Sequence, residues 1–120
     1  MKGIILSVLL LLLATLSFAD YQIVSTFVSP DLNISGLGYG NGSLWAVDRV
    51  TENVYEVDPA TGSVQNSWYC SVNGARIPSG LTFAYGTVYI ASALPGSMTD
   101  PYVYKYSSSG TYSGNFDLDC

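Results

Sequence analysis

Short runs of β-branched and aromatic residues, separated by clusters of Gly, Pro, Asn, Asp and Ser, follow one another from residue 21 onward. This alternation of apolar runs and turn-forming residues predicts strands. No segment after the first twenty residues repeats its apolar positions with a helical period, so we expect an all-β protein. The strands that we expect are Tyr21–Val28, Gly36–Tyr39, Ser43–Asp48, Asn53–Asp58, Ser63–Cys70, Gly80–Ala84, Thr87–Ala93, Tyr102–Ser107 and Thr111–Asp119.

Two stretches of the chain resemble each other at a spacing of 44 residues. Ser, Gly, Leu and Gly recur at the same places in Ser35–Ala46 and Ser79–Ile90, and several other positions hold close exchanges such as Trp45 and Tyr89. A period in the forties built from short strands is typical of β-propeller blades. We therefore expect two four-stranded antiparallel blades, one over residues 34–77 and one over residues 78–120.

The second strand of each repeat is apolar on both of its faces. In the first repeat, Leu44 and Ala46 lie on one face and Trp45 and Val47 on the other. A two-sheet sandwich buries one face of each strand, whereas a blade inside a stack buries both. The pattern favours a propeller over an immunoglobulin-like sandwich, with a plain sandwich or a β-solenoid as the alternatives.

The first nineteen residues have the features of a secretory signal. Lys2 precedes an unbroken apolar run over Ile4–Leu16, and Ser17 and Ala19 are small residues at the positions that a signal peptidase reads. A retained anchor would need about 20 apolar residues. We expect cleavage after Ala19, no membrane span in the mature chain, and a secreted, periplasmic or cell-surface location.

The strand count predicts an incomplete propeller. Residues 20–33 supply one strand, similar to the outer strand that latches many propeller rings shut, and two blades follow it. Propellers contain roughly four to eight blades. Two blades leave apolar faces bare at both ends, so we expect self-association or further blades downstream.

Charge and cysteine usage narrow the classes of partner. Removal of Lys2 takes the formal charge from −5 to −6, and so few cations argue against nucleic-acid binding.

Two cysteines in a short secreted chain usually suggest a disulfide. However, Cys70 and Cys120 each close their own repeat, on outer strands of blades that diverge, and a disulfide needs Cα atoms within about 7 Å. Mutual pairing, partners outside the chain and free thiols all remain open.

The candidate ligand residues lie on loops at one face of the expected ring. They are Asp48, Arg49, Arg76 and Asp100. The structural alternative is that Asp48 accepts hydrogen bonds from turn amides and Arg49 is solvated. Gly36–Gly40 is rich in glycine, but no helix follows it, so we interpret it as a tight inner strand and not as a phosphate loop.

The chain contains no histidine, which excludes a Ser-His-Asp triad and a histidine metal site within it. We expect no cofactor, with calcium possible only if other blades complete a site. Ten tyrosines, among them Tyr102, Tyr104 and Tyr106, suggest a protein or carbohydrate contact surface, or else cross-strand packing.

Residues 35–62 carry Ser-Gly-Leu, then Gly-Ser-Leu-Trp-Ala-Val-Asp, then Asn-Val-Tyr-Glu-Val-Asp-Pro-Ala-Thr-Gly. This string resembles blades of secreted six- or seven-bladed propellers of the NHL and YVTN types, and of streptogramin lyase, glutaminyl cyclotransferase-like and gluconolactonase-type propellers. The resemblance covers nearly all of the mature chain and implies a blade without specifying an activity. The lyase type uses His, which is absent here, and two blades could supply only part of a lactonase-type metal set.

We therefore expect a secreted propeller module that acts as a binding scaffold. The alternative is the N-terminal part of a propeller enzyme whose catalytic residues lie outside these residues.

Overall fold

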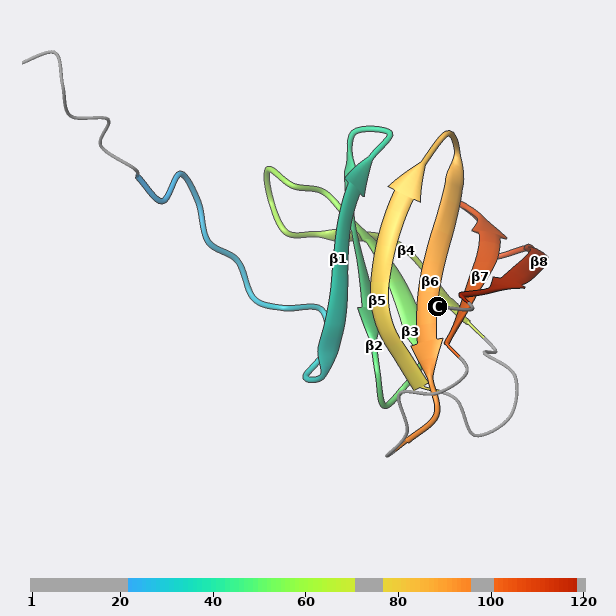
Figure 1. Ribbon diagram of the computed structural model, residues 1–120. Coiled ribbons are helices and arrows are strands. Elements are labelled where there is room, and N and C mark those ends of the chain that lie inside the picture. The colour runs from blue at the N-terminus through green and yellow to red at the C-terminus, as the bar shows by residue number, and fades with distance from the viewer. Residues whose placement is uncertain (1–21, 71–76, 96–100, 119–120) are drawn as a thin grey trace, which may run out of the picture.

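The structure is a computed structural model that describes residues 22–70, 77–95 and 101–118. Within these ranges the chain forms two four-stranded antiparallel sheets and no helix, as the sequence predicted (Figure 1). Sheet 1 contains β1 (Ile34–Gly40), β2 (Ser43–Asp48), β3 (Asn53–Val57) and β4 (Val64–Tyr69) in sequence order. Sheet 2 contains β5 (Ile77–Ala84), β6 (Thr87–Ala93), β7 (Tyr102–Ser107) and β8 (Tyr112–Asp117), also in sequence order.

Tight turns set the register of the first hairpin in each sheet. Asn41 and Gly42 connect β1 to β2 with φ values of 54° and 76°, and Tyr85 and Gly86 connect β5 to β6 with values of 50° and 77°. Two successive residues with positive φ form the turn that matches the right-handed twist of paired strands. The hairpin predicted at Asn41-Gly42 is confirmed. In the equivalent turn of sheet 2, Tyr85 takes the left-handed conformation that Asn41 has in sheet 1.

The strand limits follow the sequence pattern closely. β2, β6 and β7 have the predicted bounds, whereas β1 and β5 begin earlier, at Ile34 and Ile77. Each early start contains a register irregularity, which lies between Ile34 and Gly36 in sheet 1 and between Pro78 and Gly80 in sheet 2. A bulge lets pairing continue past a glycine or proline that would otherwise suggest a strand end.

The main core lies between the two sheets. Trp45 of β2 stacks on Phe83 of β5, with 5.2 Å between ring centroids and 13° between ring planes. Trp68 of β4 packs on Tyr106 of β7 with 5.0 Å between ring centroids. The buried residues of this core are Trp45, Val47, Val54, Cys70, Leu81, Val88, Ile90, Tyr104 and Tyr106.

The inner strands β1 and β5 lie side by side (Figure 1). Gly36, Gly38 and Gly40 occupy alternate positions of β1, so all three face β5. A Cβ atom built on Gly36 would overlap the backbone of Leu81, and one on Gly40 would overlap the ring of Phe83. The glycine-rich segment is therefore the close-packed inner strand that the sequence predicted.

The predicted strand over Tyr21–Val28 is not formed in the part that the structure describes, residues 22–28. Residues 22–33 are irregular, and most of their side chains are exposed. A strand requires hydrogen bonds to a neighbouring strand, and neither sheet pairs with this segment. Phe27 instead packs its ring against Gly62 in the turn between β3 and β4. The N-terminal segment thus covers part of sheet 1 without extending it.

Each sheet has one face toward the other sheet and one open face. We call the face that points to the following sheet the forward face, and the opposite one the rear face. The forward face of sheet 1 packs on the rear face of sheet 2. The rear face of sheet 1 and the forward face of sheet 2 are therefore the ends of a two-blade stack.

Candidate functional site

Asp48 ends β2 and is completely buried. Its Oδ1 accepts hydrogen bonds from the amides of Val50 (2.7 Å) and Thr51 (2.9 Å). Its Oδ2 accepts one from the amide of Asn33 at 2.7 Å. Both carboxylate oxygens are thus occupied by backbone donors, which is the turn-forming alternative raised for this residue. Asp48 fixes the turn after β2 and fastens the end of the N-terminal segment to it.

Asp31 makes a second attachment of the N-terminal segment. Its Oδ2 accepts hydrogen bonds from the hydroxyls of Thr51 (2.8 Å) and Tyr55 (2.7 Å), and its Oδ1 accepts one from the amide of Leu32. These donors, Tyr55 first, hold the pKa of Asp31 below its ordinary value. The pKa of Tyr55 is raised, chiefly by burial and next by its bond to Asp31.

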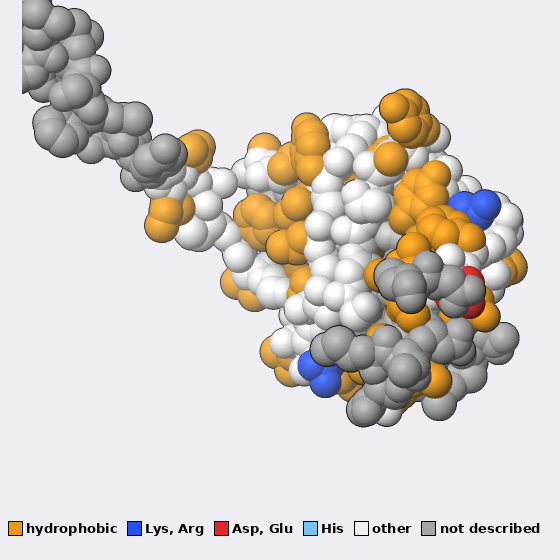
Figure 2. Space-filling model, viewed as in Figure 1, with side chains coloured by type: hydrophobic (Ala, Val, Ile, Leu, Met, Phe, Trp, Pro, Cys, Tyr) orange, Lys and Arg blue, Asp and Glu red, His pale blue; other side chains and the backbone are white. Residues whose placement is uncertain are grey.

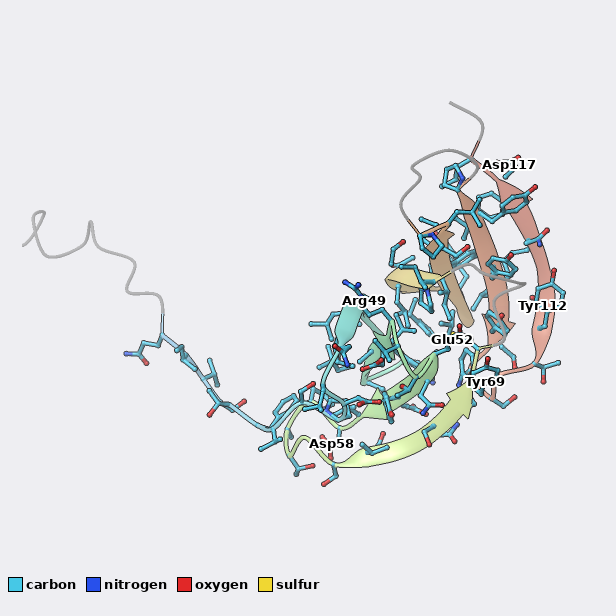
Figure 3. All side chains as sticks on the ribbon, turned by 90° about the horizontal axis from the view of Figure 1, so that it is seen from below. Arg49, Glu52, Asp58, Tyr69, Tyr112 and Asp117 are labelled. Carbon is cyan, nitrogen blue, oxygen red and sulfur yellow. The ribbon has the colours of Figure 1, made fainter. Side chains whose placement is uncertain are left out.

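The four predicted ligand residues do not form a described cluster. The Arg49 side chain is exposed and its amide donates to the Asn33 carbonyl at 3.0 Å. Figure 3 shows Arg49 well apart from the labelled acidic residues Glu52 and Asp58. Arg76 and Asp100 lie outside the described residues, as do the predicted signal over residues 1–19 and Cys120.

Cys70 follows β4 and is fully buried in the core between the sheets. Its amide donates to the Glu52 carbonyl at 2.8 Å. Burial, with a smaller contribution from the charge of Glu52, raises the pKa of the Cys70 thiol to about 12. A thiol with so little thiolate at neutral pH is a poor nucleophile and a poor metal ligand. Pairing with Cys120 stays an open prediction.

Glu52 also contacts Tyr69, and Figure 3 shows the two side chains close together at one end of sheet 1. The Tyr69 hydroxyl donates to the Glu52 carboxylate, and this bond is the main reason why the pKa of Tyr69 is raised. Glu52 itself adopts a φ of 57°, in the left-handed region. The Tyr69–Glu52 bond and the bond from the Cys70 amide to the Glu52 carbonyl both join the β2–β3 turn to the end of β4.

The described residues contain no group of three or more His, Cys, Asp or Glu side chains that could hold a metal ion. Among them, no helix is long and apolar enough to cross a membrane. Two of the three highlighted tyrosines, Tyr104 and Tyr106, are buried between the sheets. They pack against Tyr112 of β8, at ring-centroid distances of 6.4 and 5.7 Å, so this row serves cross-strand packing.

The rear face of sheet 1 carries a groove of about 450 Å³. Its lining is almost entirely apolar and includes the N-terminal segment: Phe27, Ser29, Pro30, Ile34, Leu37, Leu44, Ala46 and Val57. Leu37 is 62% exposed and Tyr39 is 65% exposed beside it. This is a large apolar area to leave in contact with water.

The forward face of sheet 2 carries a shallower hollow of about 240 Å³. Its lining residues are Gly80, Leu81, Thr82, Tyr89, Ala91 and Val103. In Figure 2 hydrophobic side chains gather at the left and at the right of the view, on either side of a paler band over β1 and β5. The two open faces are the surfaces of the described structure best suited to binding.

Sequence reasoning did not single out Phe27, Asp31, Leu37 or Tyr39. Asp31 lies just after the predicted strand Tyr21–Val28 and has no local motif that points to a role, because a side chain's distant partners are not visible in a sequence. The repeat does contain a signal for Leu37 and Tyr39, because it pairs them with Leu81 and Phe83. Leu81 and Phe83 pack against the glycines of β1, so their equivalents on β1 are residues suited to the same kind of contact.

No protein-family model matches the chain, and no curated protein matches it. Solved structures do resemble its fold. One is the quinohemoprotein alcohol dehydrogenase from Comamonas testosteroni, with a TM-score of 0.53 and 14% identity over 68% of this chain and 12% of that chain. Another is a europium-containing methanol dehydrogenase, with a TM-score of 0.54 and 16% identity over 72% of this chain and 16% of that chain.

Both of these proteins are β-propellers, and the chain spans less than a fifth of the length of either. At such low identity the likeness concerns the fold and not the chemistry. Together with the two packed four-stranded sheets, it shows that the chain has the fold of a partial β-propeller.

Proposed function

We propose that this chain is a secreted β-propeller-type module that works as a binding scaffold, and that it binds protein surfaces through the two open faces of its blades. The observation that carries the proposal is the apolar groove on the rear face of sheet 1, where Leu37 and Tyr39 are more than half exposed. Exposed apolar areas of this kind mark interaction surfaces. The predicted leader over residues 1–19 supports secretion.

The chemistry of the faces favours a protein partner over a carbohydrate. A sugar site needs polar groups that converge beside an aromatic ring, because each hydroxyl must keep a hydrogen bond when it leaves water. The lining of the rear groove offers Ser29 as its only polar side chain. The polar residues nearby are engaged already, since Asp31 accepts a hydrogen bond from the Tyr55 hydroxyl and Asp48 accepts bonds from the amides of Asn33 and Val50.

The experiment is a fluorescence titration with an apolar dye such as 8-anilinonaphthalene-1-sulfonate, on the native chain at low protein concentration. Near-ultraviolet circular dichroism follows the Trp45–Phe83 stack and confirms that each sample is folded. Leu37→Asp puts a charge on the rear face. Tyr85→Asp is the matched control, because Tyr85 is a fully exposed aromatic residue in the β5–β6 turn, outside both faces.

We expect dye binding by the native chain, a loss of most of it in Leu37→Asp, and little change in Tyr85→Asp. The proposal is wrong if the folded chain binds no dye, or if both variants lose binding equally. It is also wrong if a soluble glycan binds and Leu37→Asp leaves that binding unchanged, since the ligand site would then lie away from these faces.

The second candidate is the N-terminal part of a propeller enzyme. The fold likeness to two dehydrogenases favours it, as does the small share of those chains that this one spans. The coding sequence downstream in the source genome separates the candidates. Further blades with His, or with Glu and Asn at inner-strand ends, would favour the enzyme, and blades without them would favour the scaffold.

A further inference from the structure

The two open faces are related to the closed interface by the 44-residue repeat. Each position on the forward face of sheet 1 has its equivalent on the forward face of sheet 2, and the same holds for the rear faces. The buried pair of faces therefore indicates how the open pair could pack. On the open forward face the equivalents of Gly36, Gly38, Gly40, Trp45, Val47 and Val54 are Gly80, Thr82, Ala84, Tyr89, Ala91 and Val103.

The rear face of sheet 1 also repeats the buried one, although it is covered in part already, since Ala46 and Val57 are each 1% exposed. The equivalents of Leu81, Phe83, Val88, Ile90, Tyr104 and Tyr106 are Leu37, Tyr39, Leu44, Ala46, Tyr55 and Val57. Leu81 is 8% exposed because sheet 1 covers it, whereas Leu37 is 62% exposed at the same place in its own sheet. The difference arises from a missing neighbour and not from the type of residue.

Gly80 gives an independent indication that a strand belongs on the forward face of sheet 2. Gly36 must be glycine, because a Cβ there would overlap the backbone of β5. A Cβ built on Gly80 meets only the Cβ of Ala91, at 3.8 Å, and Gly80 does not have a positive φ. Nothing in the described structure requires a glycine there, and glycine weakens a strand. A closely packed partner strand would require one.

The hydrogen bonds of Ser35 and Ser79, which are equivalent in the repeat, also differ because only Ser35 has a neighbouring sheet in front of it. The Ser35 hydroxyl lies 3.4 Å from the carbonyl of Val47 in its own sheet and donates more closely, at 3.0 Å, to the carbonyl of Pro78 in the next one. The Ser79 hydroxyl is exposed and donates at 3.3 Å to the carbonyl of Ala91, which is the equivalent of Val47. The position of its cross-sheet acceptor is open.

We propose that a second copy of this chain docks head to tail, with the forward face of sheet 2 of one copy on the rear face of sheet 1 of the next. This rests on the proposed function and names its partner. In the joint, Leu37 packs over Gly80 as Leu81 does over Gly36. The ring of Tyr39 must turn away from the Cβ of Ala84, because a Cβ on the equivalent Gly40 would overlap the ring of Phe83. Because the two faces differ, the contact is heterologous, and it closes into a ring when each copy is rotated relative to the last as the blades of a propeller are. With about four to eight blades in a propeller, the ring holds two to four copies.

Phe27 takes part in this association as a competitor. It covers Gly62 on sheet 1 in the same way that Trp68 covers Gly110, the equivalent glycine of sheet 2. In a head-to-tail joint that place belongs to Phe116, the equivalent of Trp68. The incoming copy must therefore displace Phe27, and Phe27→Ala strengthens association several-fold.

The test is sedimentation velocity of the full secreted chain over a wide concentration range. We expect a discrete oligomer of two to four copies. Leu37→Asp blocks the rear face and Gly80→Leu blocks the forward face, and each weakens self-association at least tenfold. Both residues face open space, so the monomer stays folded by circular dichroism. The control Tyr85→Asp associates like the unaltered chain.

Mixing the two blocked variants gives the decisive result. Leu37→Asp keeps its forward face and Gly80→Leu keeps its rear face, so the mixture forms a one-to-one dimer that neither variant forms alone. Head-to-tail docking is refuted if no dimer appears in the mixture, or if the unaltered chain stays monomeric throughout. A folded monomer that still binds the apolar dye at Leu37 would reject the second copy while leaving the proposed function intact. Weaker association in Phe27→Ala would refute the competition.

Discussion

Two equivalent glycines, Gly36 and Gly80, should respond in opposite ways to the same substitution. Both lie on inner strands and are related by the 44-residue repeat. In Gly36→Ala the new methyl group would lie 2.7 Å from the carbonyl carbon and 2.8 Å from the Cα of Gly80. In Gly80→Ala it would make one ordinary contact at 3.8 Å.

The expected magnitude follows from these distances. Ordinary contacts of a methyl carbon begin near 3.4 Å, and the closest overlap is with the backbone nitrogen of Leu81, so β1 and β5 must separate by about 1 Å to accept Gly36→Ala. A gap of that size forfeits roughly a quarter to a half of the dispersion attraction between the groups concerned. Overpacking of this kind costs about 1–3 kcal/mol. Gly80→Ala should instead stabilise the monomer by about 0.4–1 kcal/mol, because it reduces the conformational entropy of the unfolded chain.

Chemical denaturation followed by tryptophan fluorescence measures both effects, since Trp45 and Trp68 lie at the joint between the sheets. The measurement must be made at concentrations where the chain is monomeric, because Gly80 lies on a face that we propose to associate. The reasoning fails if Gly36→Ala leaves the free energy of unfolding unchanged. It also fails if Gly80→Ala destabilises the chain as much as Gly36→Ala does.

Three other changes test the described loops. Asp48→Ala removes the acceptor of three part-buried amide hydrogen bonds and should cost about 3 kcal/mol of unfolding free energy, at roughly 1 kcal/mol for each bond. Asp58→Ala, in an exposed turn, should cost about 1 kcal/mol, and urea titration compares the two variants. In a Cys120→Ser background, Cys70 should react with a thiol reagent at pH 8 only as fast as the chain unfolds. The reason is that the Cys70 thiol is buried and has a pKa of about 12, and immediate reaction in the native state would contradict this. The lowered pKa of Asp31 means that its contribution to stability is present above the ordinary aspartate pKa of about 3.9 and is lost as the pH falls through its lower folded value. The protection of the Leu32 amide, which is its exchange rate relative to that of an unstructured amide at the same pH, should therefore fall in acid. Asp31→Asn should lower this protection already at neutral pH.

Local patterns were sufficient to predict most of the strands. β2, β6 and β7 have the expected limits because each is a run of strand-forming residues between strong turn residues. The Asn41-Gly42 hairpin was predictable because its turn type depends on backbone preferences within two residues. The early starts of β1 and β5 were not, since a bulge depends on the partner strand.

The N-terminal segment shows where local patterns fail. Its apolar residues suit a strand, but a strand exists only where another offers its backbone, and residues 22–33 pair with neither sheet. The contact of Phe27 with Gly62 joins positions far apart in the sequence, as does that of Asp31 with Tyr55. Such contacts depend on how the sheet folds back, which no short window of residues specifies.

The sequence by itself determined the all-β class, the turns, the repeat and the two-blade plan, because these depend on neighbouring residues and on a period of 44. The tertiary structure decided how the same residue types are used. Leu81 is core and Leu37 is surface, Gly36 is required by packing and Gly80 is not, and Asp48 is occupied by three amides. The physical reason is that a residue is buried only where a second surface covers it. The sequence repeat produces two similar surfaces, but it does not specify whether another surface packs against each of them.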